Sequence, residues 1–512
     1  MTKDYENGSR WADPTEIKDA PTIAHIDIEN DDCSAGGIPI ISNGRTAYVD
    51  FTDTHTMIFG STGSKKTRLF GMPLINILAM SGESIIVSDP KGELYDKTSG
   101  LVAQRGYKTV VLNFRDLEQS DCWNPLALPY ELYHSGKRDE AISLLNDFLN
   151  ALAEPQKRGT KDPYWIVLGC SMALAYLLFF IETATAEEAN IFNFANFCAS
   201  NSSAGDFEEL SNYIAEGSIA SVNFNGILTL KDTSNTYNCI ASEISSMLNP
   251  FIIRKTLCQV LSKSSFDIRS IGKSKTAIFI IVPDEKTTLH FLITAFIKQT
   301  YETLINEAQQ QENKKLPVRV NFILDEFANI PAIPDMSSMI SAARSRNIRF
   351  YLLAQGMRQL YCKYGEEAHT VKGNCDNLIF LTSRETTLLE NFSLLCGTVL
   401  TKNMDGKENV KPLISVSELQ RLSKEKGEAL ILHGRNYPFV TQLPDIDEYT
   451  FKKYPPIKTE DRTLPQIVRY NVDKVLEEIR KGKKPVPFSV EVYGEERFYK
   501  CTKPESSDIF DW

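Results

Sequence analysis

A short glycine-rich segment near the start of the chain has the residue types that bind phosphate. An apolar run at Thr56–Phe59 precedes it, a helical pattern over Arg68–Met80 follows it, and its residues are Gly60, Ser61, Thr62, Gly63, Ser64, Lys65, Lys66 and Thr67. In a phosphate-binding loop, backbone N–H groups turn around the β-phosphate, a lysine reaches the β- and γ-phosphates, and a hydroxyl holds Mg²⁺. Lys66 and Thr67 stand at the positions of the last two groups. The segment is therefore a candidate site for ATP with Mg²⁺.

One residue of this segment departs from the strict pattern, which has glycine immediately before the lysine. Lys65 occupies that position. A relaxed glycine-rich turn of this kind is also found in ordinary strand-to-helix connections. The segment alone does not distinguish a nucleotide loop from such a connection.

Two adjacent carboxylates farther along the chain favour the nucleotide loop. The apolar run Val320–Leu324 is followed at once by Asp325 and Glu326. Carboxylates at the end of a buried strand are costly unless they meet a cation or a proton-transfer partner. In a P-loop ATPase the first acid holds Mg²⁺ and the next activates the attacking water. The alternative is a strand that runs into a polar loop whose acids cap the next helix. The order of the two motifs favours nucleotide hydrolysis.

A third polar residue ends the next predicted strand. Arg349–Ala354 is apolar in most positions and leads into Gln355, whose amide can both donate and accept a hydrogen bond. Beside the strand with the two acids, such a side chain is placed to sense a γ-phosphate. An incidental polar residue at a strand end is the other interpretation.

The elements that must position these residues form an α/β pattern. Further strand-like runs lie at 84–88, 109–113, 277–282, 378–382 and 428–433, and most alternate with helical segments. Strands that are apolar throughout and alternate with helices predict a mainly parallel sheet covered on both faces. Strand signals stop over 131–264, where helical patterns such as Asp139–Ala153 predict an all-helical insertion. The expected organisation is an N-terminal extension (1–40), two parts of a nucleotide-binding domain (41–130 and 265–445), the insertion between them, and a C-terminal appendage (446–512) with a helix at Pro465–Arg480.

Composition limits the remaining possibilities. The formal charge of −10 argues against a protein that binds nucleic acid over its whole surface. A local basic channel is compatible with this charge. The cysteines show no Cys-x-x-Cys pair, so reduced thiols are expected. Tyr164–Ile181 is long enough for a membrane helix, but a helix buried inside the helical domain is the preferred interpretation. The opening residues are mostly polar, and neither a secretory signal nor an N-terminal anchor is expected.

Several longer strings carry a family resemblance. They are GSRWA (8–12), DPKGELY (89–95), WNP (123–125), DEFANIP (325–331), ARSRNI (343–348) and AQ (354–355), in a match that runs from Gly8 to Tyr437. In this order they resemble the type IV secretion coupling proteins, the TraG/TraD-type ATPases of conjugation. The resemblance implies a RecA-like P-loop NTPase with an all-helical domain that assembles as a hexamer.

The resemblance also implies roles for single residues. It makes Lys66 and Thr67 the nucleotide clamp, Asp325 the Mg²⁺ acid, Glu326 the catalytic base and Gln355 the sensor, with Asp89 and Lys91 near the nucleotide. Arg344 matches an arginine that acts on the neighbouring subunit, and Arg346 is a second candidate. For both arginines a solvated helix face is the alternative.

The implied function is recruitment of relaxase-bound DNA to the secretion channel and its translocation at the expense of ATP. The partners would be DNA, a relaxase or other secreted protein, channel components and a separate membrane-anchor protein, because the transmembrane helices usual in the family are not seen. The expected location is the cytoplasm, at the membrane surface. The alternative function is a docking receptor for protein substrates that binds nucleotide and hydrolyses it poorly, which Lys65 favours. The basic tract Arg480–Lys484 is a further candidate for contact with DNA or anionic lipid.

Overall fold

The chain folds into two compact units. The computed structural model describes residues 8–160, 162–215, 218–229, 234–283, 285–402, 408–458, 462–484, 490–492 and 495–497. The first unit comprises residues 1–116 and 267–460, and the second comprises residues 117–266 and 461–512. Trp123 explains why the second unit begins earlier than 131. Its side chain is buried and its backbone N–H donates to Val260 O at 3.0 Å, so the segment around it packs with the helices.

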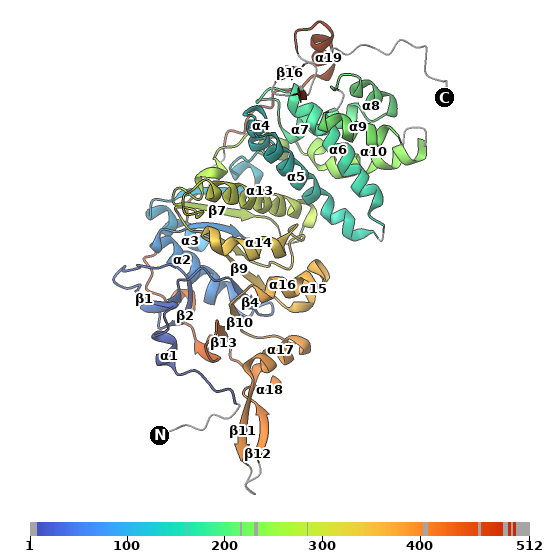
Figure 1. The fold of residues 1–512 in the computed structure, drawn as a ribbon. Helices are drawn as coiled ribbons and strands as arrows, with labels where there is room; N and C mark the ends of the chain where they lie inside the picture. The colour runs from blue at the N-terminus through green and yellow to red at the C-terminus, as the bar shows by residue number, and fades with distance from the viewer. Residues whose placement is uncertain are drawn as a thin grey trace. The chain divides into compact units, whose positions relative to one another are not determined.

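The first unit is built on a mainly parallel sheet (Figure 1). In the described residues the strand order is β14-β13-β10-β4-β9-β8-β5-β7-β6, and only the β10–β13 and β13–β14 pairs are antiparallel. This topology confirms the predicted α/β class. The strands are β4 (Thr56–Phe59), β5 (Ser84–Ser88), β6 (Lys108–Asn113), β7 (Thr276–Ile281), β8 (Val320–Leu324), β9 (Ile348–Ala354), β10 (Asn377–Phe380), β13 (Glu428–His433) and β14 (Phe439–Gln442).

Alternate side chains of the central strands fill two separate cores. Ile323 and Tyr351 belong to a buried cluster that includes residues of α2 (Met72–Ser81) and α3 (Glu93–Gln104). On the other face, the rings of Phe322 and Phe350 stack at 4.9 Å, and Tyr301 of α13 (His290–Gln309) lies 6.2 Å from Phe350. Burial on both faces explains why these strands are apolar throughout, without the alternation of a half-exposed strand.

Two smaller sheets in the first unit were not predicted. Strands β1 (Ile23–Asp27), β2 (Ile38–Ser42) and β3 (Thr46–Asp50) form an antiparallel sheet that packs into the same core as α2 and α3. Strands β11 (Thr398–Lys402) and β12 (Glu408–Pro412) form a hairpin. Much of the segment predicted as an N-terminal extension is therefore part of the first unit. Its remaining helices are α1 (Pro14–Lys18), α14 (Met336–Ala343), α15 (Met357–Tyr364), α16 (Glu367–Gly373), α17 (Thr386–Cys396) and α18 (Val416–Leu419).

The second unit consists mostly of helices. They are α4 (Ala127–His134), α5 (Arg138–Gly159), α6 (Tyr164–Thr183), α7 (Ile191–Ser200), α8 (Ala204–Ser211), α9 (Ile219–Leu228), α10 (Ser234–Leu248), α11 (Pro250–Ile253), α12 (Lys255–Val260) and α19 (Val472–Arg480), with a short pair β15 (Val490–Val492) and β16 (Glu495–Arg497). Helix α6 is the central one, since it packs against α5, α7, α9 and α10.

Helix α6 is also the one helix of the described residues that is long and apolar enough to cross a membrane. In the most apolar stretch of 18 residues in this helix, 67% of the residues are buried. The ring of Tyr176 lies within 5.5 Å of those of Phe197 and Phe207 from α7 and α8. These contacts are those of a core helix in a helical domain, and they favour the buried interpretation of Tyr164–Ile181.

The helix expected at Pro465–Arg480 is shorter than predicted, because α19 begins only at Val472. Residues 462–471, before it, have no regular secondary structure and contact the helices of the same unit. Gln259 donates to Pro465 O at 3.2 Å, and the Tyr470 ring packs edge-on against Phe180 with centroids 4.9 Å apart. These tertiary contacts replace the helical hydrogen bonds that the local pattern predicted.

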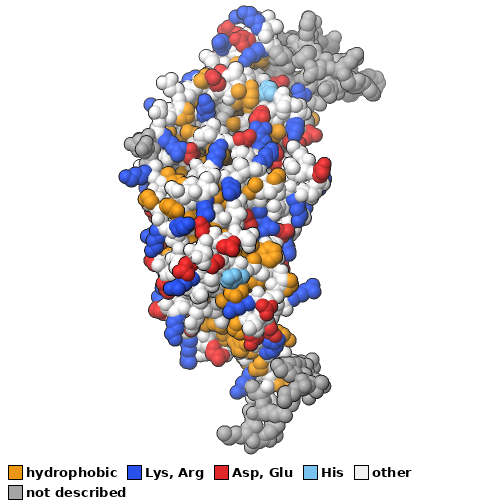
Figure 2. Space-filling model, turned by 90° about the vertical axis from the view of Figure 1, so that its left-hand side faces the viewer, with side chains coloured by type: hydrophobic (Ala, Val, Ile, Leu, Met, Phe, Trp, Pro, Cys, Tyr) orange, Lys and Arg blue, Asp and Glu red, His pale blue; other side chains and the backbone are white. Residues whose placement is uncertain are grey.

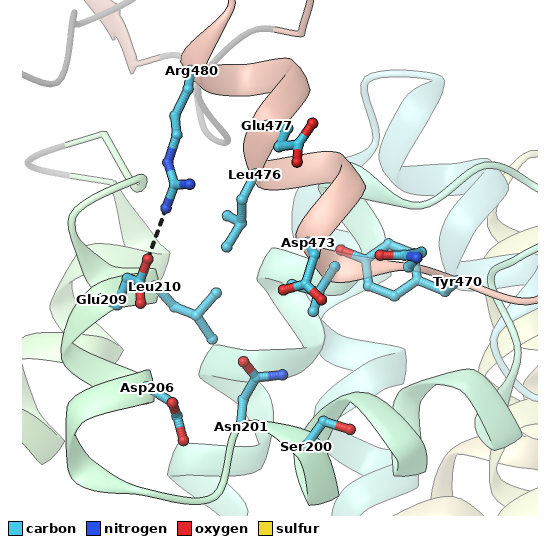
Figure 3. Close-up of a pocket in the computed structure, with 12 residues that line it drawn as sticks. Ser200, Asn201, Asp206, Glu209, Leu210, Tyr470, Asp473, Leu476, Glu477 and Arg480 are labelled. Atoms are coloured by element: carbon cyan, nitrogen blue, oxygen red, sulfur yellow. Dashed lines mark hydrogen bonds and ion pairs between the residues drawn. The ribbon is translucent and has the colours of Figure 1, made fainter.

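The basic tract Arg480–Lys484, which begins at the last residue of α19, is largely paired within the same unit. Arg480 binds Glu209 at 2.8 Å at the edge of a polar pocket of about 630 Å³ (Figure 3). Lys481 lies 3.0 Å from Glu477, and Lys484 donates to Thr183 O at 3.0 Å. Pairing with acidic neighbours lowers the positive potential that these side chains offer to DNA or lipid phosphates.

Candidate active site

The glycine-rich segment leaves the carboxyl end of β4 between two neighbouring strands. Gly60 N–H donates to the O of Ala354, the last residue of β9, at 3.1 Å, and Ser61 N–H donates to Thr382 O beyond β10 at 2.9 Å. A Cβ at Gly60 would lie only 2.4 Å from Ser64 Oγ and 3.1 Å from Lys66 Cγ, so a side chain here would displace both loop residues. The segment then enters a wide helical turn, η1 (Thr67–Gly71), which continues as α2. The predicted helix Arg68–Met80 thus has a π-helical first turn.

Lys66 points into the site and is almost completely buried. Its Nζ donates to Gly60 O at 2.5 Å and lies 4.0 Å from Glu326 Oε1. Burial lowers the pKa of Lys66 from its usual value, and the charges of Glu326 and Asp325 act in the opposite direction. A buried cation with only partial compensation is suited to receive an anion.

Lys65 has the backbone conformation that normally selects glycine. Its φ is +66°, in the left-handed region, which costs a residue with a side chain about 1–2 kcal/mol. The preceding glycine, Gly63, also has positive φ. Position 65 therefore keeps the left-handed backbone that glycine adopts readily, although its side chain departs from the strict pattern. The side chain of Lys65 pairs with Asp445, with a Nζ–Oδ2 distance of 3.5 Å.

The two acids after β8 lie beside this loop. Thr67 Oγ1 donates to Asp325 Oδ2 at 3.2 Å, so the hydroxyl and the carboxylate predicted to hold Mg²⁺ are neighbours. Burial and then the charge of Glu326 raise the pKa of Asp325 to about 6. A divalent cation at this position would compensate the buried carboxylate.

Glu326 is held by three polar neighbours. Its Oε2 accepts from Gln355 Nε2 at 2.8 Å and from Asn329 Nδ2 at 3.2 Å, and its Oε1 faces Lys66. Its φ of +51° is unusual for glutamate and turns the chain sharply after Asp325. Strained backbone at a cluster of polar groups is typical of functional sites. The structure therefore brings the predicted base, sensor and lysine together.

Asp89 and Lys91 follow β5 at the same edge of the sheet. Asp89 is buried, and its carboxylate accepts from the backbone N–H of Tyr95 at 2.8 Å, in the first turn of α3. Burial raises the pKa of Asp89 to about 6, and the nearby charge of Asp325 contributes in the same direction. Lys91 is exposed, and its charge lowers the pKa of Lys66. Both residues thus act electrostatically on the site, with Asp89 also fixing the start of α3.

The two arginines lie elsewhere in the first unit. Arg344 and Arg346 belong to a 3-10 turn (η5, Arg344–Arg346) that precedes β9, whereas Gln355 follows the same strand. A strand rises about 3.3 Å per residue. Arg344 therefore lies near the amino end of β9, whereas the loop lies at the carboxyl ends of the strands. Its Nη1 pairs with Asp376 at 2.7 Å. Arg344 therefore does not contact the nucleotide site of its own chain.

Asp445 and Asn329 belong to this region but were not singled out from the sequence. Asn329 lies within the DEFANIP string, where its distance of three residues from Glu326 was a usable signal. Asp445 has no local signal. It binds Arg68 through two contacts, one of them at 2.9 Å, and the Arg68 hydrogen bond is the main cause that lowers the pKa of Asp445.

The residues present fit a nucleotide with Mg²⁺. Ser64 Oγ is buried in the loop without a hydrogen-bond partner among the described residues, which is the state expected of a group that faces a phosphate. No cluster of three or more His, Cys, Asp or Glu side chains in the described part of the chain could hold a metal alone. Mg²⁺ usually binds one or two protein oxygens and completes its shell with phosphate and water, so Thr67 and Asp325 suffice.

Comparison with known proteins agrees with this geometry. The family model "Type IV secretory system Conjugative DNA transfer" matches residues 11–430. The chain is similar in structure to the bacterial conjugative coupling protein TrwBdeltaN70 in a trigonal form with sulphate, with a TM-score of 0.61 and 14% identity over 90% of this chain and 97% of that chain. It is also similar to plasmid coupling protein TrwB in complex with the ATP analogue ADPNP (TM-score 0.61, 14% identity, 90% and 98% coverage) and with ADP and Mg²⁺ (0.60, 15%, 89% and 95%). No curated protein matches the chain.

The likeness to these structures shows a shared fold, a RecA-like P-loop unit with a helical domain, as predicted. The family model covers most of the chain, including the loop, both acids and Gln355. The chain therefore belongs to the conjugative DNA transfer family of type IV secretion systems, the coupling proteins.

Proposed function

We propose that this chain is an ATPase that couples ATP hydrolysis to the delivery of DNA into a type IV secretion channel. The observation that carries the proposal is the convergence of Lys66, Thr67, Asp325, Glu326 and Gln355 at the carboxyl ends of β4, β8 and β9. Ligands of open α/β sheets bind at this edge. The solved TrwB complexes with ADPNP and with ADP and Mg²⁺ support the choice of nucleotide and metal.

Each residue of the cluster has a role in this proposal. ATP with Mg²⁺ supplies a phosphoryl group whose charge is partly neutralised by the metal. Lys66 and the loop N–H groups would bind the phosphates, and Thr67 and Asp325 would hold the metal. Glu326 accepts the proton of the attacking water, and Gln355 orients the carboxylate of Glu326 through the 2.8 Å hydrogen bond.

The test is the rate of phosphate release by the purified chain with MgATP, with and without single-stranded DNA. The motor predicts turnover that DNA stimulates. A specific observation favours the second candidate function, a docking receptor that binds nucleotide and hydrolyses it poorly, because Lys65 occupies the glycine position with a strained backbone. That receptor would bind ATP with a similar affinity but show slow turnover unchanged by DNA.

We propose that DNA contacts an assembled oligomer of this chain. The salt dependence of DNA binding tests this contact. On the face drawn in Figure 2, lysine and arginine side chains are scattered among aspartate and glutamate. With a net charge of −10, attraction to DNA must come from a local basic surface. A hexamer with a central basic channel is the proposed form, and the further partners are a relaxase or another secreted protein and channel components.

Arg344→Ala tests the cooperation of subunits. Because Arg344 lies at the far edge of the sheet from its own site, we expect the variant to bind ATP normally but to lose DNA-stimulated turnover, by about 10³-fold or more for a finger that acts in trans. Mixing it with excess Glu326→Gln subunits should restore partial activity, because mixed interfaces pair an intact Glu326 with an intact Arg344.

Arg346→Ala, two positions farther, is the matched variant for this experiment. Its Nη1 contacts Ala342 O at 3.4 Å, and we expect it to retain turnover. If native mass spectrometry shows mixed oligomers but the Arg344→Ala mixture stays inactive, the trans role of Arg344 is wrong. Arg346 would then be tested in the same mixing design.

Membrane association is proposed to depend on a partner. Helix α6 is buried in the helical unit, so it is not free to insert in a bilayer without unfolding that unit. We expect the chain to sediment with membranes only in cells that also express its conjugation genes, and to be released by alkaline carbonate washing. Retention of the chain alone in carbonate-washed membranes would contradict the proposal and identify α6 as a membrane helix.

A further inference from the structure

A cluster of ion pairs joins the start of the nucleotide loop's helix to a segment near the end of the first unit. The cluster, called here the Asp445 cluster, consists of Lys65, Arg68, Asp445 and Asp447. Arg68 Nε donates to Asp445 Oδ2 at 2.9 Å, Arg68 Nη2 lies 2.5 Å from Asp447, and Lys65 Nζ lies 3.5 Å from Asp445. Asp445 is mostly buried, with 15% of its side chain exposed, whereas Asp447 is 66% exposed.

We propose that Asp445 is a positioning residue of the nucleotide site. It holds Lys65 in the left-handed backbone conformation that the loop requires where the strict pattern has glycine. The inference rests on the proposed nucleotide binding and adds a residue to it. In this chain the departure at Lys65 is thereby compensated by an acid that lies far away in the sequence.

The geometry favours Asp445 over the other members of the cluster. Lys65 has φ +66°, and its Nζ lies 3.5 Å from Asp445, whereas the Nζ of Lys66 lies 4.0 Å from Glu326. Asp445 itself is fixed by Arg68, which stands one turn farther along in η1. The carboxylate therefore contacts both sides of the turn that carries Lys66 and Thr67. The Asp447 side chain pairs with Arg68 and its backbone N–H donates to Asp445, and no ion pair joins it to Lys65 among the described residues.

The inference predicts a specific dependence on the side chain at position 65. Without Asp445, Lys65 can relax toward the right-handed region, and the backbone N–H groups that would face the β-phosphate lose their alignment. Glycine has no such preference, because it populates positive φ as readily as negative φ. Loss of Asp445 should therefore weaken nucleotide binding when position 65 is lysine. It should change nucleotide binding very little when position 65 is glycine.

A double-mutant cycle measures this dependence. The variants are Asp445→Asn, Lys65→Gly and the double variant, in the full chain, with dissociation constants for MgATP and MgADP. Asparagine is chosen because its side-chain oxygen can still accept from the N–H of Asp447, as Asp445 Oδ1 does at 3.4 Å. We expect Asp445→Asn to weaken the binding of both nucleotides by about 5- to 30-fold, which is the left-handed preference converted to a ratio of dissociation constants. In the Lys65→Gly background we expect less than about 2-fold.

Two further readouts separate positioning from general stability. Asp447→Asn removes the ion pair between Asp447 and Arg68. This variant should bind MgATP and MgADP with unchanged affinity. In nucleotide-free thermal unfolding, Lys65→Gly should raise Tm more in the Asp445→Asn chain than in the wild type, because the strain is then uncompensated.

The outcomes separate the inference from the proposed function. If the wild type binds ATP and Asp445→Asn weakens binding equally with Lys65 and with Gly at position 65, Asp445 does not act through Lys65 and the inference is overturned. Equal losses for Asp447→Asn and Asp445→Asn would overturn it as well. A wild-type chain that binds neither ATP nor ADP would overturn the proposed function and the inference with it.

Discussion

Replacing Lys66 by alanine is expected to abolish ATP turnover. Lys66 is the buried cation of the loop, with its Nζ 2.5 Å from Gly60 O and 4.0 Å from Glu326. Removing one preorganised group that stabilises charge in a water-poor site typically costs about 10²- to 10³-fold in rate. Loss of a charged hydrogen bond to phosphate should also weaken MgATP binding by more than about 10-fold. Both effects are measured by phosphate release and by titration of a fluorescent ATP analogue.

The fold should survive this change, because Glu326 keeps its hydrogen bonds from Gln355 and Asn329. Lys65→Gly is the matched control, since it removes the adjacent lysine, and we expect turnover within a few fold of the wild type. Wild-type affinity in Lys66→Ala would show that the loop does not bind the phosphates. A large gain in Lys65→Gly would show that Lys65 slows the motor.

The second large effect is expected for Glu326→Gln, which should bind MgATP with nearly wild-type affinity and hydrolyse it about 10²- to 10⁴-fold more slowly. The change removes the proton acceptor while it keeps the size of the side chain. The carboxylate is well placed for this role, since Gln355 and Asn329 fix its orientation. Single-turnover hydrolysis with saturating MgATP separates the chemical step from binding.

Glu312→Gln provides the control for the charge change, because Glu312 is exposed and lies in the loop after α13. Normal turnover in both variants would remove Glu326 from the mechanism. Asp89, the other buried carboxylate at this edge of the sheet, would then be the next candidate.

The parts of the fold that the sequence predicted are those determined by local pattern. The predicted strands at 56–59, 84–88 and 428–433 coincide with β4, β5 and β13, because strands buried on both faces are continuous apolar runs. The sheet β1–β3 was missed for the opposite reason. Its strands are partly exposed, with polar residues such as His25 and Tyr48 packed against each other at the surface.

The site was predictable where its residues stand next to strand ends. Lys66, Asp325, Glu326 and Gln355 each follow a recognisable strand, and parallel strands bring such positions to one edge. The Asp445 cluster was not predictable, because an ion pair between residues 65 and 445 leaves no trace in either local segment. The backbone conformation of Lys65 was equally hidden, since lysine has no preference for positive φ.

The order of strands in the sheet has a consequence for synthesis of the protein on the ribosome. β4, which carries the nucleotide loop, pairs with β9 and β10, and neither strand exists until the chain has grown from Phe59 past Ile348. At about 5–20 residues per second this takes roughly 15 to 60 s. During that time both edges of β4 are unpaired, although the strand is completely buried in the final fold. Nascent chains that stop before β9 should therefore aggregate unless a chaperone covers β4, and the first unit can fold only after most of the second has been made.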